Sequence, residues 1–349
     1  MSIQLCYVSG RRDGLISTIR FDDKAATADV VARLNLGPKP MPLELNIGQR
    51  LLRVATGADP LRVSTLRLLP DGACQVLSEV NCPVSATYLS FTPDDRMALV
   101  VSYHANRLAW APVWENHLID DSAWHVEQVG DQPHCVVPAP DGRHVYVVSL
   151  GSNRIEGFRV GDSQLVADEQ IGVQFERGAG PRHLVFDASG RHGYLIEELG
   201  GHIVHLIRDI GSGRLTLAEQ VPYSDSADDL RPGVHVPSGR TPTLDDQMLR
   251  HWGAELALDP QRRWIVASER RASTLNLQAL NDDGSFGPRL DHVPTEKQPR
   301  GMGLIGDDHV IVGAELGETA TIYRVDTRLE PLAQVDGLGG PVWFASIAE

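Results

Sequence analysis

The feature of this sequence that most limits its fold is a hairpin-like pattern that recurs along most of the chain. Each copy has an alternating apolar run, a turn containing Asp, Gly or Pro, and a second apolar run. The clearest copies are residues 86–102, 134–149 and 182–197, and weaker copies lie at 42–55 and 254–268. One turn residue gives the register of six copies: Arg50, Arg96, Arg143, Arg191, Arg263 and His309. Successive turns are 46, 47, 48, 72 and 46 residues apart.

A repeat of about 40 to 50 residues with four short strands is typical of a β-propeller blade. In the third copy, strands are expected near 134–140, 144–150, 154–160 and 164–170. A seventh blade can form from both ends of the chain, because 340–347 has the pattern of a first strand and 4–9 and 14–21 supply further strands. No segment keeps a helical period. We predict an all-β, seven-bladed β-propeller, closed by its N- and C-terminal strands, with residues 1–349 as one domain.

The gap of 72 residues marks an insertion into one repeat. The extra residues fall in 222–251, which are polar and rich in Pro, Asp and Gly. A long segment of this kind is either a tolerated surface loop or a lid over a binding site. The sequence leaves both interpretations open.

Charge and targeting signals narrow the class of protein. A formal net charge of -14 argues against nucleic-acid binding, which needs a broad basic face. The four cysteines, Cys6, Cys74, Cys82 and Cys135, match no zinc or disulfide spacing and are expected to be free thiols. Residues 1–10 show no signal peptide, and no apolar stretch is long enough to span a membrane. We therefore expect a cytoplasmic protein with no membrane partner, and a monomer, because a closed ring leaves no sheet edge to pair.

Hairpin geometry places several charged residues at one end of the propeller. Residues equally distant from a turn lie opposite each other, which predicts that Arg182 neighbours Glu198 and that His134 pairs with Leu150. The same reasoning gathers six residues at the channel mouth: His134, Arg182, His183, Glu198, Arg270 and Arg300. Any one of them alone is more often a surface ion pair or a structural hydrogen-bonding group. Their convergence in an acidic chain predicts an anion-binding site.

Three runs carry a resemblance to a known family. Residues 178–186 (GAGPRHLVF), 295–301 (TEKQPRG) and 340–343 (GPVW) resemble the propeller-type 6-phosphogluconolactonases and their relatives, the carboxymuconate lactonising enzymes among them. The resemblance implies a pocket at one mouth of the channel and no required metal or cofactor. It also implies a site built from His134, Arg182, Glu198 and Arg300.

The sequence departs from the family pattern at two places. Glu197 stands where the family often has Asn, and Glu269-Arg270-Arg271 stands where it often has Asn-Arg-Gly. These differences and the insertion leave room for a different substrate.

The leading hypothesis is hydrolysis of a small anionic sugar lactone. The substrate class would be 6-phosphogluconolactone or an aldonic or aldaric 1,5-lactone, such as glucaro- or galactarolactone. Glu198 is the expected general base and His134 its acid or base partner. Arg182 and Arg300 are expected to bind the anionic group or the oxyanion. Arg270 and His183 are further candidates for substrate binding.

Two other functions stay open at this point. A cycloisomerase that forms a lactone from a muconate-type dicarboxylate needs the same anion clamp and proton-transfer group. A non-catalytic propeller that binds proteins is the third possibility, although a convergent charged mouth disfavours it. A calcium-assisted lactonase has no ligand cluster in the sequence to recommend it.

Overall fold

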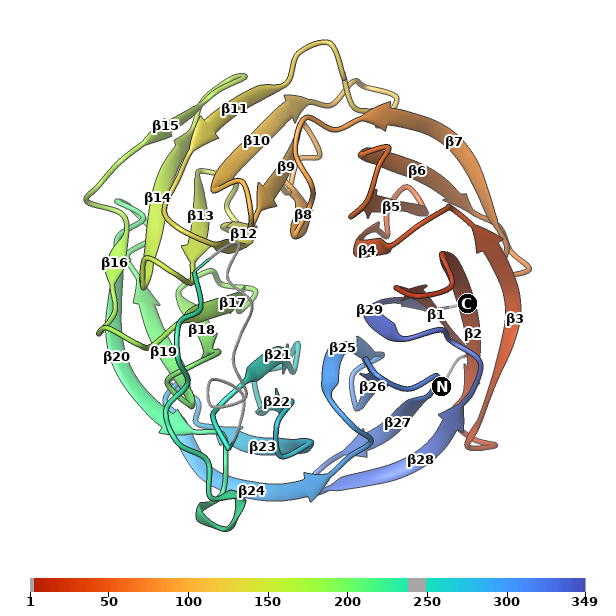
Figure 1. Ribbon diagram of the computed structural model, residues 1–349, viewed down its shortest axis with the longest axis vertical. Coiled ribbons are helices and arrows are strands. Elements are labelled where there is room, and N and C mark those ends of the chain that lie inside the picture. The colour runs from red at the N-terminus through yellow and green to blue at the C-terminus, as the bar shows by residue number, and fades with distance from the viewer. Residues whose placement is uncertain (1–2, 238–248, 349) are drawn as a thin grey trace.

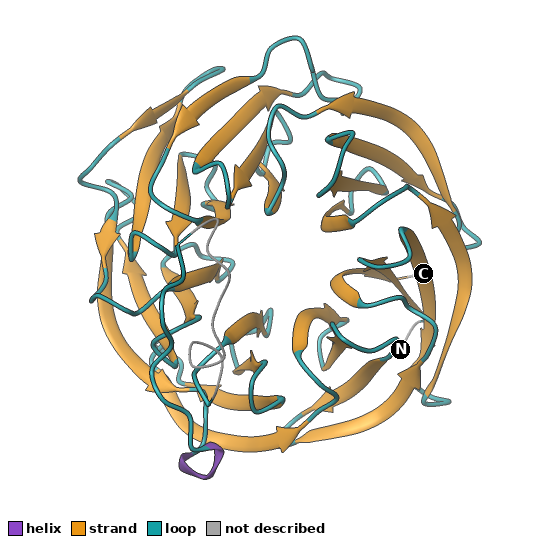
Figure 2. Cartoon of the chain, in the orientation of Figure 1, coloured by secondary structure: helices purple, strands orange, loops and turns teal. Residues whose placement is uncertain are grey.

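The fold is a ring of seven β-sheets around a central channel, as the computed structural model shows for residues 3–237 and 249–348 (Figure 1). Almost all regular structure in these residues is strand, and the one short 3-10 helix, Ser226–Asp228, lies in the insertion (Figure 2). The prediction of an all-β seven-bladed propeller is confirmed.

Each of the first four blades is an antiparallel sheet whose first strand lines the channel. Blade 1 contains β4 (Pro40–Asn46), β5 (Leu51–Thr56), β6 (Arg62–Leu68) and β7 (Cys74–Asn81). Blade 2 contains β8 (Tyr88–Phe91), β9 (Met97–Ser102), β10 (Arg107–Pro112) and β11 (His125–Gln128). Blade 3 contains β12 (Pro133–Pro138), β13 (His144–Ser149), β14 (Arg154–Val160), β15 (Leu165–Ala167) and β16 (Val173–Gln174). Blade 4 contains β17 (Pro181–Phe186), β18 (His192–Glu197), β19 (His202–Arg208) and β20 (Leu215–Pro222).

The last three blades follow the same plan. Blade 5 contains β21 (Gly253–Leu258), β22 (Trp264–Glu269), β23 (Thr274–Leu280) and β24 (Phe286–Pro294). Blade 6 contains β25 (Pro299–Ile305), β26 (His309–Ala314), β27 (Ala320–Val325) and β28 (Leu329–Val335). Blade 7 joins the two ends of the chain in the order β29 (Pro341–Ala348), β1 (Gln4–Gly10), β2 (Leu15–Asp22) and β3 (Thr27–Asn35). The predicted closure by terminal strands is therefore confirmed.

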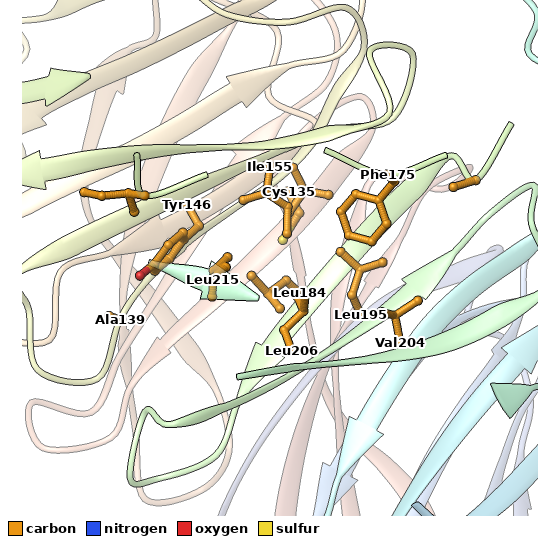
Figure 3. Packing of buried hydrophobic residues seen from close by; sticks show 13 residues of the cluster. Cys135, Ala139, Tyr146, Ile155, Phe175, Leu184, Leu195, Val204, Leu206 and Leu215 are labelled. Carbon is orange, nitrogen blue, oxygen red and sulfur yellow. The ribbon is translucent and has the colours of Figure 1, made fainter. Parts of the chain in front are cut away.

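The core consists of apolar layers between neighbouring blades. Second strands such as β9 and β13 are buried along their whole length, whereas the outermost strand β3 alternates exposed and half-buried residues. Between blades 3 and 4, Cys135, Tyr146, Leu184 and Leu195 pack in one cluster (Figure 3). All four cysteines are free thiols, as expected.

The first strands of several blades contain a bulge near their start, and three of these bulges skip a single residue. In β12, β17 and β25 the pairing with the second strand skips one residue, and the skipped residues are His134, Arg182 and Arg300. The predicted pairing of His134 with Leu150 is wrong, because the amide of Leu150 bonds instead to the carbonyl of Gln132. A bulge leaves its extra residue out of the ladder and re-aims that side chain.

A buried arginine ties blade 4 to blade 3. Arg208, on β19, is 0% exposed, and its Nη2 donates to the Asp141 carboxylate at 2.8 Å and to Nδ1 of His144 at 2.8 Å. Its Nε donates to the hydroxyl of Tyr146 at 2.8 Å. Removing one partner of a buried ion pair leaves the other charge and its hydrogen bonds uncompensated.

We expect Arg208→Met to lower the free energy of unfolding by about 3 kcal/mol, because it removes the buried donor to His144 and Tyr146 and one of the two arginines that pair with Asp141. The urea midpoint measures this loss. The matched control is Arg324→Met, since Arg324 is 44% exposed and pairs with Asp23 at 3.3 Å on the surface. Exposed pairs of this kind contribute about 1 kcal/mol or less, so equal losses in the two variants would contradict the prediction.

Candidate active site

A cavity of about 300 Å³ opens at one mouth of the channel. Four of the six predicted residues line it: His134 on β12, Glu198 after β18, Arg270 after β22 and Arg300 on β25. The other two, Arg182 and His183, lie behind it and are 2% and 3% exposed. The structure thus gathers all six at one place, although the chain supplies them from four blades.

Glu198 is held between two arginines. Its Oε2 lies 2.9 Å from Nε of Arg182 and 2.9 Å from Nη2 of Arg270. The predicted contact between Arg182 and Glu198 is confirmed. Arg182 also donates to the backbone carbonyl of Ala254, so it is fixed on two sides and supports the cavity from behind.

Arg270, which the sequence suggested only as a further candidate for substrate binding, lines the cavity directly. Its guanidinium carbon lies 3.8 Å from the centroid of the Trp252 ring, a cation–π contact. Burial lowers the pKa of Arg270 to about 9, although the charge of Glu198 opposes that shift. Arg300 has a different carboxylate partner from Arg270, because its Nη1 donates to Glu315 at 2.6 Å.

A carboxylate and two histidines form a hydrogen-bonded chain that ends at the cavity. Nδ1 of His183 lies 2.6 Å from Oε1 of Glu255, and Nε2 of His183 lies 3.1 Å from Nδ1 of His134. An ionised carboxylate can only accept, so His183 donates to Glu255 and accepts from His134. This order leaves a lone pair on Nε2 of His134. Of the three hydrogen-bonded residues, His134 is the one that lines the cavity.

The surroundings of both histidines favour the neutral form. Burial, followed by the charge of Arg182, keeps the pKa of His134 well below its usual range. Burial also lowers the pKa of His183, and Glu255 opposes part of that shift. A neutral imidazole with a lone pair in a cavity can accept a proton at neutral pH.

The sequence did not reveal Glu255. This residue lies in the bulge of β21, where the pairing passes from Gly253 directly to Leu256. Blade 4 begins Pro181-Arg182-His183-Leu184 and blade 5 begins Gly253-Ala254-Glu255-Leu256, so Glu255 occupies the position of His183 in the next repeat. Alignment of the blade starts could have drawn attention to it.

The described part of the insertion, 222–237 and 249–251, runs across the mouth of blades 4 and 3 (Figure 1). The amide of Gly233 donates to the carbonyl of Leu199 at 2.8 Å, and Nε2 of Gln132 donates to the carbonyl of Val236 at 2.9 Å. Residues 233–236 line a second cavity of about 330 Å³ beside the first. The insertion therefore borders the site, as a lid would, while the rest of it lies outside the described residues.

The described residues contain no group of three or more His, Cys, Asp or Glu side chains placed to hold a metal ion. Within the same residues, no helix has the length and apolar character needed to cross a membrane.

The propeller matches a known protein family. The model of the family "Lactonase, 7-bladed beta-propeller" matches residues 5–345. The chain belongs to this family. It is therefore a lactonase, an enzyme that hydrolyses a cyclic ester.

Several relatives are similar to this lactonase over most of their length. A 6-phosphogluconolactonase of Pectobacterium carotovorum is 26% identical over 312 residues, 88% of each chain. One from Serratia proteamaculans is 24% identical over 355 residues, 99% of each chain. The solved structure of a periplasmic gluconolactonase of Pseudomonas aeruginosa has a TM-score of 0.83 at 22% identity and covers 99% of each chain. This last likeness shows the shared fold.

We expect Glu255→Gln to lower the kcat of the lactonase by at least about 10-fold, because an amide can donate to His183 and reverse the order of donors along the chain. The control is Glu219→Gln, since Glu219 lies 3.5 Å from His205 in another carboxylate–histidine pair. Initial rates on any lactone that the wild type hydrolyses measure the effect, with the urea midpoint as a check on folding. Unchanged kcat in Glu255→Gln would remove Glu255 from the proton path.

Proposed function

We propose that this lactonase hydrolyses the ring ester of a sugar-acid lactone that carries an anionic group. The class includes 6-phosphogluconolactone and aldonic or aldaric 1,5-lactones such as glucaro- and galactarolactone. The observation that carries the proposal is the chain of hydrogen bonds from Glu255 through His183 to His134, in a cavity that Arg270 and Arg300 also line.

The charge at the mouth supports an anionic substrate. Five cationic side chains lie in or directly behind the cavity, against three carboxylates. The cationic residues are Arg11, Lys39, Arg182, Arg270 and Arg300, and the carboxylates are Glu198, Glu255 and Glu315. A local excess of cations in a chain of net charge -14 favours binding of an anion at this place.

The residues can carry out hydrolysis in two steps. Nε2 of His134 takes a proton from a water as that water attacks the lactone carbonyl, and Arg270 and Arg300 stabilise the charge on the carbonyl oxygen. The tetrahedral intermediate then collapses, the ring C–O bond breaks, and His134 gives its proton to the leaving alkoxide. One water is consumed and an open-chain acid is formed.

This scheme gives Glu198 a different role from the one its sequence position suggested. Protonation of Glu198 would leave the guanidinium groups of Arg182 and Arg270 without their shared counter-charge in a buried site. Glu198 therefore serves better as the group that positions these arginines. His134, whose Nε2 keeps its lone pair, serves better as the base.

The first test is a panel of lactones followed by pH-stat, with the spontaneous rate subtracted. We expect acceleration of at least one lactone among gluconolactone, 6-phosphogluconolactone, glucarolactone and galactarolactone, with kcat/KM highest for a lactone that carries an anionic group. No acceleration of any member would overturn the proposal. Turnover of a muconate-type dicarboxylate to a lactone would then favour the cycloisomerase alternative.

The second test separates the two candidate bases. We expect His134→Asn to lower kcat by at least about 100-fold, and Glu198→Gln by less, because general base catalysis typically contributes that much or more. In the wild type, kcat should stay constant as the pH falls from 8 through 6.5, the usual pKa of histidine. The reason is that His134, with its lowered pKa, stays neutral until the pH falls well below 6.5. A larger loss in Glu198→Gln than in His134→Asn would return the base to Glu198.

A cytoplasmic location and a monomeric state stay predictions for this chain. Fractionation and light scattering, respectively, test them.

A further inference from the structure

The second cavity, of about 330 Å³, is not used by any step of the proposed reaction. Tyr103, Glu198 and Trp252 line both this cavity and the one that holds His134. The two cavities are therefore neighbours, and a ligand that passes these side chains would occupy both. Each cavity lies at the lower end of the about 300 to 1,000 Å³ that ligand pockets occupy, so each suits a small ligand or one end of a longer one.

Arg271 lines the second cavity and lacks a partner for its charge. No hydrogen bond or ion pair of its side chain occurs within residues 3–237 and 249–348, and its Nε is buried without an acceptor. The nearest carboxylate in sequence, Glu269, accepts from the backbone amides of Trp252 and Ala272 instead. Arg270 and Arg300, by contrast, each pair with a glutamate.

One aromatic ring fixes both neighbouring arginines. The guanidinium carbon of Arg270 lies 3.8 Å from the centroid of the Trp252 ring, and that of Arg271 lies 4.9 Å from it. The two cations are thus at most about 8.7 Å apart, and an extended six-carbon acid can reach from one to the other. A planar guanidinium with free donors suits a carboxylate or a phosphate.

We propose that Arg271 binds a second anionic group, a carboxylate or a phosphate, at the end of the substrate remote from the lactone carbonyl. The proposal rests on the proposed function for the position of the carbonyl beside His134. It makes the second cavity a specificity subsite, which selects acids with charge at both ends of the opened chain. Arg271 takes no part in the proton transfers.

Binding of product acids tests this subsite without any turnover. Calorimetry would compare gluconate, which has one carboxylate, with glucarate, which has two, and with 6-phosphogluconate, which has a carboxylate and a phosphate. We expect Arg271→Gln to raise the Kd of glucarate or 6-phosphogluconate at least about 10-fold, the usual loss for a hydrogen bond to a charged group. The Kd of gluconate should change less than about 2-fold, because its carboxylate is held beside Arg270 and Arg300. The acid whose Kd rises more, glucarate or 6-phosphogluconate, shows whether Arg271 binds a carboxylate or a phosphate.

Two further variants serve as controls. Arg271→Lys keeps the charge and should restore part of the affinity, whereas Arg67→Gln removes an exposed arginine on β6 and should change nothing. Equal weakening of all three acids by Arg271→Gln, or no weakening of any, would overturn the subsite.

Kinetics separates failure of this proposal from failure of the proposed function. If the wild type hydrolyses gluconolactone and 6-phosphogluconolactone, Arg271→Gln should lower kcat/KM for the phosphorylated lactone at least about 10-fold and leave gluconolactone unchanged. Equal kcat/KM values for the two lactones in both proteins would reject the subsite and retain the lactonase assignment. Absence of hydrolysis together with a selective loss of glucarate binding would reject the reaction and retain the subsite.

Discussion

The pairing of the two chain ends determines where everything else in the ring lies. β29 and β1 pair from Gln4–Ala348 to Ser9–Trp343, which makes the last strand of the chain the innermost strand of blade 7. Without this pairing, blade 7 would keep an open edge beside the channel. The closing strand also contacts the site, because the Trp343 ring lies 5.1 Å from Tyr88 and 5.8 Å from His183 between centroids. The strand that closes the ring therefore also packs against His183, the hydrogen-bond partner of His134.

The bulges explain why polar side chains of the candidate site come from the starts of the inner strands. A regular strand would alternate its side chains between two blade interfaces, both of which are apolar. The extra residue in β12, β17 and β25 escapes this alternation, so His134, Arg182 and Arg300 can gather without polar groups entering the apolar layers. The glutamates offset part of the positive charge that gathers in this way, since Glu198 pairs with Arg182 and Arg270 and Glu315 pairs with Arg300.

The sequence predicts those parts of the structure that depend on local geometry. The hairpin turns, the blade count and the contact between Arg182 and Glu198 follow from residues close together in the chain. The predicted pairing of His134 is wrong because counting from a turn assumes that each residue lies opposite one other residue. A bulge adds an unpaired residue to one strand and shifts the count. Glu255 was missed because its partner His183 lies 72 residues away in the neighbouring blade, a contact that only the closed ring creates.

The acidic surface places a condition on how such a site can bind an anion. A net charge of -14 repels an anionic substrate at long range, so electrostatic steering cannot supply its affinity. Affinity must come from short-range contacts inside the cavities, where charges are screened less than at the surface. Trp252 makes this possible, because its ring holds Arg270, which pairs with Glu198, beside Arg271, which has no carboxylate partner among the described residues. Arg270, paired with Glu198, can then stabilise charge that appears only during the reaction, while the unpaired Arg271 favours charge already present on the substrate.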